Sequence, residues 1–299
     1  MPVPFAASYS RGVFLVLVGG FFLSLAGILL RQVESADGWQ ILFYRSISFF
    51  ATLSLILWFK YRDTTVAAFR SVGARGLAAA IVLGLGSVSY VFALLNTTVA
   101  NAVFIIGASP LVTALIGWVF LRERVWAASV VAMFGALAGI GLMFADGLVD
   151  GGTLGNLMAL GVVASFSVFL LIVRGSKDLD MLPATCLAGL VAGAIAAAMA
   201  DSLAVTGSDL VIGLLLGSVQ FTGGFMLLTI GARHLPAAEV ALFSLSEAVL
   251  APLWVWLGVN ETPSLLALAG ASVVLLSVIG YCVIGIRRRS RTTSNGSAE

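Results

Sequence analysis

A carboxylate in the middle of an apolar segment is the residue of this chain best suited to chemistry. Glu247 lies within the apolar run 238–258, where an ionised group without a partner is costly. It is either a cavity carboxylate, which binds an ammonium group or exchanges a proton, or a protonated or hydrogen-bonded acid that stabilises helix packing. In a helix, Ser244 and Trp254 share its face, because the positions follow a spacing of three or four residues.

The other reactive side chains do not form an enzyme-like group. The chain has one histidine, His234, in a short polar connection, and its two cysteines, Cys186 and Cys282, lie apart in apolar segments. No histidine accompanies a candidate nucleophile, no second carboxylate pairs with Glu247, and no Gly-x-x-x-x-Gly-Lys sequence is present. We therefore expect no enzyme activity, no metal site and no cofactor, and we expect both thiols to be free and packed.

Two prolines interrupt the hydrogen bonding of apolar segments. Pro252 removes the bond to the carbonyl of Ala248, and Pro110 removes the bond to Ile106. Both segments are therefore predicted to bend. The freed carbonyls either belong to structural kinks or accept hydrogen bonds from a ligand, and kinks are the commoner outcome.

Other polar side chains within apolar segments are candidates for lining a cavity. Tyr90 and Gln220 are predicted to line it, because an unpaired polar group inside a span is penalised. Small and hydroxylated residues more often serve helix packing or bond back to their own helix, so both interpretations stay open for them. The candidate binding residues are Glu247, Ser244, Tyr90, Gln220, Ser109, Ser24, Ser167, Thr113 and Trp254.

The composition indicates which elements position these residues. Of 299 residues, 60% are hydrophobic and 10% are charged, and the mean hydropathy is +1.10, whereas soluble domains have roughly 25% charged residues. A helix that spans a bilayer needs roughly 20 apolar residues. We predict an all-α polytopic membrane protein with ten spans, near 12–30, 39–59, 76–95, 100–121, 125–145, 154–173, 182–200, 210–231, 238–258 and 263–286, followed by a basic, disordered tail, 287–299.

The basic residues are distributed asymmetrically between the connections. If the N-terminus is cytoplasmic, all but two of the 16 Lys and Arg residues fall on the cytoplasmic side, as the positive-inside rule describes. The exceptions are Arg31, outside, and Arg45, within a span. We expect Arg45 to extend outward to the membrane surface rather than pair with Glu247. Both termini are therefore predicted to be cytoplasmic.

The chain contains two related halves, 1–149 and 150–286. Shifts of 138 and 143 residues align Trp118 with Trp256, Glu123 with Glu261, Ser24 with Ser167 and Arg31 with Arg174. Five helices per half is an odd number, so the second half enters the membrane from the opposite side. Such inverted repeats are typical of secondary transporters, whose binding site lies near the midplane between the halves.

One motif of the second half is specific enough to suggest a family. The run 232–238 (Ala-Arg-His-Leu-Pro-Ala-Ala), followed by Glu247 and Glu261, resembles the drug/metabolite transporter superfamily in its ten-helix EamA-type branch. The first-half counterpart is the run 108–110 (Ala-Ser-Pro) with Glu123. Ala248 stands where the family has a proline after the glutamate, and Pro252 follows four residues later. The resemblance covers nearly the whole chain.

The resemblance implies a central cavity surrounded by helices 1, 3, 4, 6, 8 and 9. It also implies export of small metabolites, and the overall pattern is most similar to amino-acid exporters. We therefore expect an exporter of amino acids, including hydrophobic and aromatic ones, that works by alternating access in the bacterial inner membrane. The alternatives are an exporter of another metabolite or of a lipophilic cation, which depends more on Glu247 and aromatic walls, and a membrane receptor without flux.

The expected partners are a small-molecule substrate and membrane lipid, and not nucleic acid. Gly135 and Gly139 form a small-xxx-small pair in the fifth span. This pair leaves two alternatives open, a contact between the subunits of a homodimer and packing within one chain.

Overall fold

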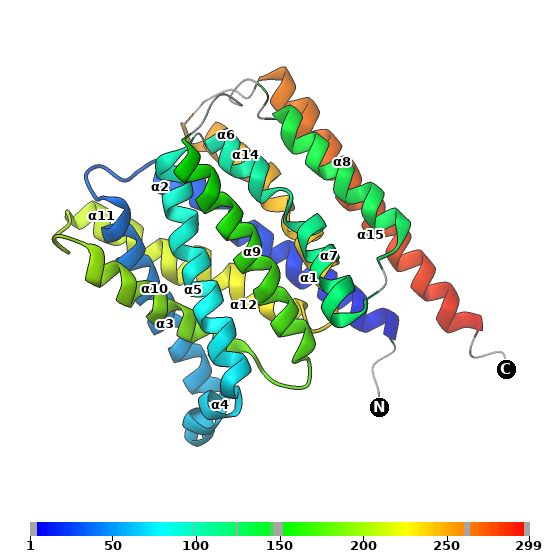
Figure 1. Cartoon of the computed structure of the whole chain (residues 1–299), viewed down its shortest axis with the longest axis horizontal. Coiled ribbons are helices and arrows are strands. Elements are labelled where there is room, and N and C mark those ends of the chain that lie inside the picture. Colours follow the sequence, from blue (N-terminus) through cyan, green and yellow to red (C-terminus); the bar gives the residue numbers. More distant parts are fainter. Residues whose placement is uncertain are drawn as a thin grey trace.

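A computed structural model describes residues 5–97, 99–123, 125–143, 145, 152–259 and 264–295. Within these ranges all regular structure is helical (Figure 1). The helices of the first half are α1 (Phe5–Ser24), α2 (Ala26–Leu30), α3 (Gly38–Tyr61), η1 (Arg62–Thr64), α4 (Thr65–Ser71), α5 (Gly73–Asn96), α6 (Val99–Ile106), α7 (Ser109–Leu121) and α8 (Ala127–Met143). Those of the second half are α9 (Thr153–Gly175), α10 (Leu182–Met199), α11 (Gly207–Leu215), η3 (Leu216–Phe221), α12 (Thr222–Gly231), α13 (Ala237–Ser244), α14 (Ser246–Val259) and α15 (Leu265–Asn295).

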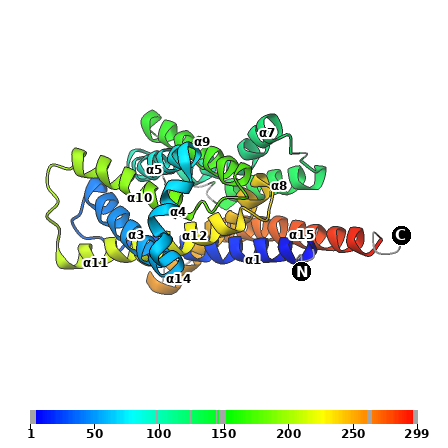
Figure 2. The ribbon, with the colours of Figure 1, turned by 90° about the horizontal axis from the view of Figure 1, so that it is seen from below.

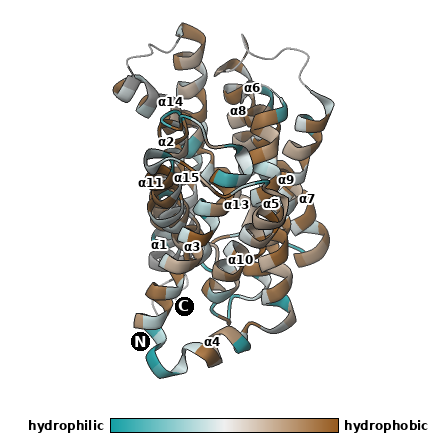
Figure 3. Ribbon diagram, turned by 90° about the vertical axis from the view of Figure 1, so that its left-hand side faces the viewer, coloured by the Kyte–Doolittle hydropathy of each residue, from teal (hydrophilic) through white to brown (hydrophobic). Residues whose placement is uncertain are grey.

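The helices have the length and surface expected of a membrane protein. In the described part of the chain, nine helical segments are long and apolar enough to cross a bilayer, and α8 is a shorter apolar helix of 17 residues. Large apolar side chains point outward, since Phe14, Phe120 and Leu276 are 66%, 76% and 72% exposed. Figure 3 shows predominantly hydrophobic ribbons. The protein is therefore an all-α polytopic membrane protein, as predicted.

The start of α3 is set by a local signal in the sequence. The Asp37 carboxylate accepts hydrogen bonds from the backbone N–H groups of Trp39 and Gln40 at 2.8 and 2.9 Å. The Gln40 side chain in turn accepts one from the Asp37 N–H at 2.9 Å. This reciprocal capping box begins the helix at Gly38 and places Arg45 about two turns inside it.

The two halves interlock. α5 of the first half packs against α9 of the second, and α12 of the second packs against α1 of the first. The interruption between α6 and α7, at Gly107 and Ala108, recurs at the 138-residue shift between α13 and α14, at Leu245. With an odd number of crossings in each half, the repeats run in opposite directions. Accordingly, the start of α1 and the end of α15 lie at the same end of the bundle (Figures 1 and 2).

α8 and α15 form a pair at one edge of the bundle (Figure 1). A Cβ atom on Gly139 would stand 2.8 Å from the Gly270 carbonyl oxygen, and one on Gly135 would stand 2.6 Å from the Ser277 hydroxyl. The two glycines therefore let α15 approach α8 closely. The small-xxx-small pair serves packing within the chain, and the expectation of a homodimer has no support from it.

α15 is longer than the sequence suggested. It continues to Asn295, so the part of the 287–299 tail that the structure describes is helical. Arginine is a good helix former, and extending a helix that has already nucleated costs little.

Candidate functional site

A cavity of about 730 Å³ lies between the two halves. Its walls come from α1, α2, α3 and α5 to α7 of the first half and from α9, η3 and α12 to α14 of the second. α8 and α15 contribute through Ile140, Met143 and Ala267. The wall formed by α3, the second spanning helix, is additional to the six helices that the family resemblance implied. Most lining side chains are apolar.

Six of the candidate residues line this cavity, and three do not. The lining includes Ser24, Tyr90, Ser109, Gln220, Ser244 and Glu247. All six lie within predicted spans, and they come from α1, α5, α7, η3, α13 and α14. The tertiary structure thus brings together residues that are more than 200 positions apart in the chain.

Thr113 and Ser167 are buried away from the cavity. Both are 0% exposed, and the Thr113 hydroxyl donates a hydrogen bond to the Ser167 hydroxyl at 2.8 Å. The cavity wall carries Ser165 in place of Ser167, because two positions along a helix turn a side chain by about 200°. The sequence analysis did not identify Ser165, although it is a second serine within the same apolar run, 154–173.

Trp254 acts on the cavity indirectly. Its indole N–H donates a hydrogen bond to the Ser24 hydroxyl at 2.7 Å, and that hydroxyl donates to the Phe21 carbonyl at 2.6 Å. Phe21 also packs edge-on against the indole ring, with centroids 5.4 Å apart. Trp254 therefore positions α1 and the cavity-lining Ser24, and is not itself part of the lining.

The helix interruptions border the cavity. Pro110 lies in the first turn of α7, and the Ser109 hydroxyl donates a hydrogen bond to the Ile106 carbonyl, the group that the proline leaves without its helical partner. In the second half, the interruption lies at Leu245, before Glu247, rather than beside Pro252. α14 continues through position 252, whose side chain lies outside the described residues.

A tight contact with α1 accompanies the second interruption. A Cβ atom on Gly20 would stand 2.5 Å from the Ser246 hydroxyl. The N–H of Ala248 bonds to the Leu245 carbonyl at 3.0 Å, which is the short pattern of a tightened turn. The first turn of α14 therefore presents Glu247 to the cavity.

Glu247 is half-buried on the cavity wall. Among the described residues no hydrogen bond or ion pair satisfies its carboxylate. An intramembrane acid without a protein partner is available to a ligand or a proton. This arrangement fits the first of the two interpretations of Glu247.

Arg45 does not extend to the membrane surface, so that prediction is wrong. The residue is 7% exposed and lines the cavity. Its guanidinium carbon lies 4.1 Å from the centroid of the Phe221 ring and 5.9 Å from that of Tyr90. The depth of Arg45, two turns inside α3, was the only signal in the sequence for this position.

Close packing between α3 and the second half holds Arg45 in place. A Cβ atom on Gly217 would stand 2.1 Å from the Arg45 carbonyl oxygen, so only glycine permits this approach. Ser48 donates a hydrogen bond to the Leu214 carbonyl at 2.7 Å, and Tyr44 donates one to the Leu203 carbonyl at 2.6 Å. These contacts fix α3 against α11 and η3 and bring Phe221 under the guanidinium group.

Gln220 lies on η3, a π-helical turn that interrupts the spanning helix. Its side-chain NH₂ donates a hydrogen bond to the Leu23 carbonyl at 3.1 Å, and its Oε1 has no hydrogen-bond partner among the described residues. Single π-turns occur frequently at functional sites. Gln220 therefore offers a buried acceptor beside the cavity.

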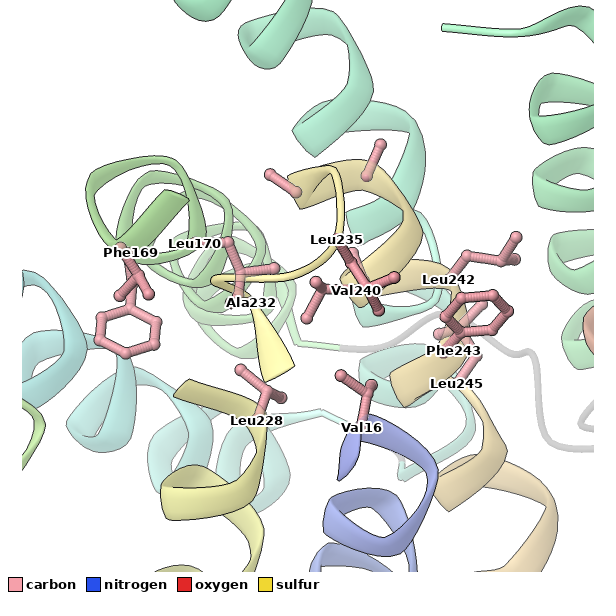
Figure 4. Close-up of a cluster of buried hydrophobic side chains, with 14 of the residues drawn as sticks. Val16, Phe169, Leu170, Leu228, Ala232, Leu235, Val240, Leu242, Phe243 and Leu245 are labelled. Carbon is pink, nitrogen blue, oxygen red and sulfur yellow. The ribbon is translucent and has the colours of Figure 1, made fainter. Parts of the chain in front are cut away.

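The cavity reaches one end of the bundle and is closed toward the other. Its lining extends to Leu30, Arg31 and Leu94. The opposite side is filled by the apolar cluster of Figure 4, which includes Val16 and Leu235, both 0% exposed. Leu245 belongs to both the cluster and the lining, and so forms part of the cavity floor.

Polar contacts reinforce the closed end. The Arg174 Nε donates to the Glu123 carboxylate at 2.8 Å, and another Arg174 nitrogen donates to the Arg233 carbonyl at 3.0 Å. Glu123 also accepts a long hydrogen bond from the Ala237 N–H at 3.4 Å. These contacts join the end of α7, the end of α9 and the connection between α12 and α13.

Comparisons with known proteins agree with this architecture. A solved structure titled "Crystal structure of protein" has a TM-score of 0.77 to this chain at 17% sequence identity, covering 90% of this chain and 96% of that chain, which establishes the fold alone. No curated protein matches the chain. The model of the EamA-like transporter family matches residues 10–145 and 153–283, once for each half. This chain therefore belongs to the EamA-like transporter family.

Proposed function

We propose that this protein exports amino acids, including hydrophobic and aromatic ones, by alternating access. The family supports a transporter of small molecules, and the substrate class is inferred from the cavity. The observation that carries the proposal is Glu247, a carboxylate without a hydrogen-bond partner in the described part of the chain, on a wall that is otherwise mostly apolar. Such a site suits a ligand with an ammonium group and an apolar side chain.

The size and walls of the cavity support the same substrate class. Ligand pockets for small molecules are roughly 300–1,000 Å³ in volume, and this cavity measures about 730 Å³. Phe166, Phe221 and Phe225 line it and supply aromatic surface for an apolar side chain. Aromatic walls with one acid also favour a lipophilic cation, which is the second candidate substrate.

The proposed membrane orientation follows from the charges. The closed end carries Arg174 and Arg233, and the open end carries Arg31. Because most of the basic residues that the structure describes lie toward the closed end, the positive-inside rule makes that end cytoplasmic, with both termini on the same side. In the bacterial inner membrane the cavity then faces outward in this structure, and rocking of the two inverted halves exposes it inward.

Tracer counterflow into proteoliposomes tests the proposed function. Vesicles containing the purified protein are preloaded in turn with amino acids, nucleosides, sugars and a lipophilic cation. Accumulation of a labelled amino acid, driven by preloaded amino acids, is expected. Exchange of only the lipophilic cation would establish the second candidate, and binding without exchange of any compound would indicate a receptor.

The substitution Glu247→Gln tests the residue that carries the proposal. It is expected to reduce counterflow strongly while leaving the thermal unfolding midpoint in detergent nearly unchanged, because the neutral amide no longer attracts an ammonium group. Asp63→Asn is the matched control, since Asp63 is an exposed acid of η1. Wild-type exchange by a folded Glu247→Gln variant would contradict the assigned role of Glu247.

A further inference from the structure

α3 places a positive charge, Arg45, on the cavity wall. The proposed function assigns no role to this residue. Arg45 is 93% buried yet lines the cavity, and its Nε has no hydrogen-bond partner among the described residues. No described carboxylate lies within ion-pair distance of it. A buried cation without an anion is costly, so a ligand that brings an anion into the cavity gains from the pairing.

Two aromatic rings lie beside the Arg45 guanidinium group. Phe221 lies 4.1 Å from the guanidinium carbon and Tyr90 lies 5.9 Å from it, measured to the ring centroids. Stacking uses the face of the guanidinium group. Its N–H donors lie in the plane and match the two oxygens of a carboxylate. The arrangement is therefore suited to a planar anion that approaches from the cavity.

Glu247 supplies the opposite charge on another wall of the same cavity. Arg45 belongs to α3 and Glu247 to α14, and both line the cavity without forming an ion pair with each other. Tyr90 lines the same cavity, and its ring centroid lies 5.9 Å from the Arg45 guanidinium carbon. Two separate, unpaired charges of opposite sign complement a ligand that itself carries both.

We propose that Arg45 binds the carboxylate of the substrate while Glu247 binds its ammonium group. This inference rests on the proposed function and narrows it: the substrates are zwitterionic amino acids, and amines without a carboxylate are poor substrates. Arg45 is then the residue that separates amino acids from lipophilic cations.

The decisive experiment compares ligands that differ only in the carboxylate. Phenylalanine, phenylalanine amide and 2-phenylethylamine are tested as inhibitors of labelled-phenylalanine counterflow by the wild-type protein. Loss of the carboxylate is expected to weaken inhibition about tenfold or more, as for a charge-assisted hydrogen bond. Equal inhibition by phenylalanine and 2-phenylethylamine would overturn the proposal without any mutant.

Variants then assign the effect to Arg45. Arg45→Gln is expected to weaken inhibition by phenylalanine about tenfold and to leave inhibition by phenylalanine amide unchanged. The preference for the carboxylate then disappears. Phe221→Leu keeps the charge of Arg45 but removes the aromatic contact with its guanidinium group. It is expected to reduce the preference for the carboxylate, and it provides the test if Arg45→Gln does not fold. Arg70→Gln, which removes an exposed charge of α4, is the matched control. A preference retained in both Arg45→Gln and Phe221→Leu would overturn the role of Arg45.

A binding measurement separates this inference from the proposed function. Thermal stabilisation of the detergent-solubilised protein is measured with 3-phenylpropionate and with its amide. If no amino acid is exchanged, the proposed export fails; stabilisation by the acid alone, lost in Arg45→Gln, would still establish an anion subsite. Equal effects of acid and amide would reject the subsite even if amino acids are transported.

Discussion

The contact between η3 and α3 predicts a large effect from a single methyl group. In Gly217→Ala the new Cβ atom would stand 2.1 Å from the Arg45 carbonyl oxygen, 2.7 Å from the Phe49 nitrogen and 2.7 Å from the Ser48 Cβ atom, whereas ordinary contact begins at 3.4 Å. The first two neighbours are backbone atoms of α3 and cannot rotate away. η3 and α3 must therefore separate by about 1 Å at this point.

The cost follows from close packing. Inserting a methyl group into a well-packed interior costs about 1–3 kcal/mol, and replacing glycine by alanine in a helix returns up to about 1 kcal/mol. Because two of the clashes are with backbone atoms, the upper part of that range, about 2–3 kcal/mol, applies. After the gain in helix propensity, we therefore expect Gly217→Ala to destabilise the protein by about 1–2 kcal/mol. It also moves Phe221 away from Arg45, so the half-saturating concentration of substrate should rise.

Thermal unfolding of the purified variants in detergent measures the effect. The control is Gly117→Ala in α7, where a Cβ atom would have no neighbour within 4 Å and where only the helix-propensity gain applies. Gly217→Ala should unfold at a lower temperature than the wild type, and Gly117→Ala at the same or a higher temperature. Equal stability of the two variants would refute the argument that the backbones are in contact at Gly217.

Three further predictions concern contacts outside the cavity. Thr113→Val and Ser167→Ala should each lower the free energy of unfolding by about 1 kcal/mol, and the double substitution should lower it by less than their sum, because it leaves no unpaired hydroxyl. Thermal unfolding measures these differences, and counterflow should be unaffected. Glu123→Gln removes an ion pair with Arg174 whose side chains are 25% and 23% exposed, so it should cost about 1 kcal/mol or less, and high salt should reduce the difference from wild type. Burial, together with neighbouring arginines, lowers the pKa of His234 from its ordinary 6.5, so the folded state binds the proton less well than the unfolded chain. Stability should therefore fall as the pH drops through about 6.5. In His234→Gln the thermal unfolding midpoint should change less between about pH 7.5 and about pH 5.5 than in the wild type.

The candidate site illustrates how far helical spacing carries an inference. Glu247 and Gln220 were recognisable because a polar group inside an apolar run is costly wherever the helix faces. Thr113 and Ser167 looked equivalent to them along the chain, but hydroxyl groups can pair with each other, as these two do at 2.8 Å. Depth in the membrane follows from sequence position, whereas the direction of a side chain depends on the neighbouring helix.

The direction of the Arg45 side chain also could not be predicted from the sequence. Its position allowed both an outward and an inward side chain. The choice is made by Gly217, 172 positions later, which lets η3 press against the α3 backbone and carries Phe221 under the guanidinium group. No pattern within either helix encodes that contact.

The sequence by itself determined the membrane class, the positions of the spanning helices and the two related halves. Hydropathy, charge and repetition are properties of the chain, and an apolar segment that crosses a bilayer must satisfy its backbone hydrogen bonds internally, as a helix does. Only the tertiary structure decided where the spanning helices break, which hydroxyls pair with each other and that Arg45 and Glu247 share one cavity. These features depend on contacts between residues far apart in the chain, and such contacts exist only once the two halves have interlocked.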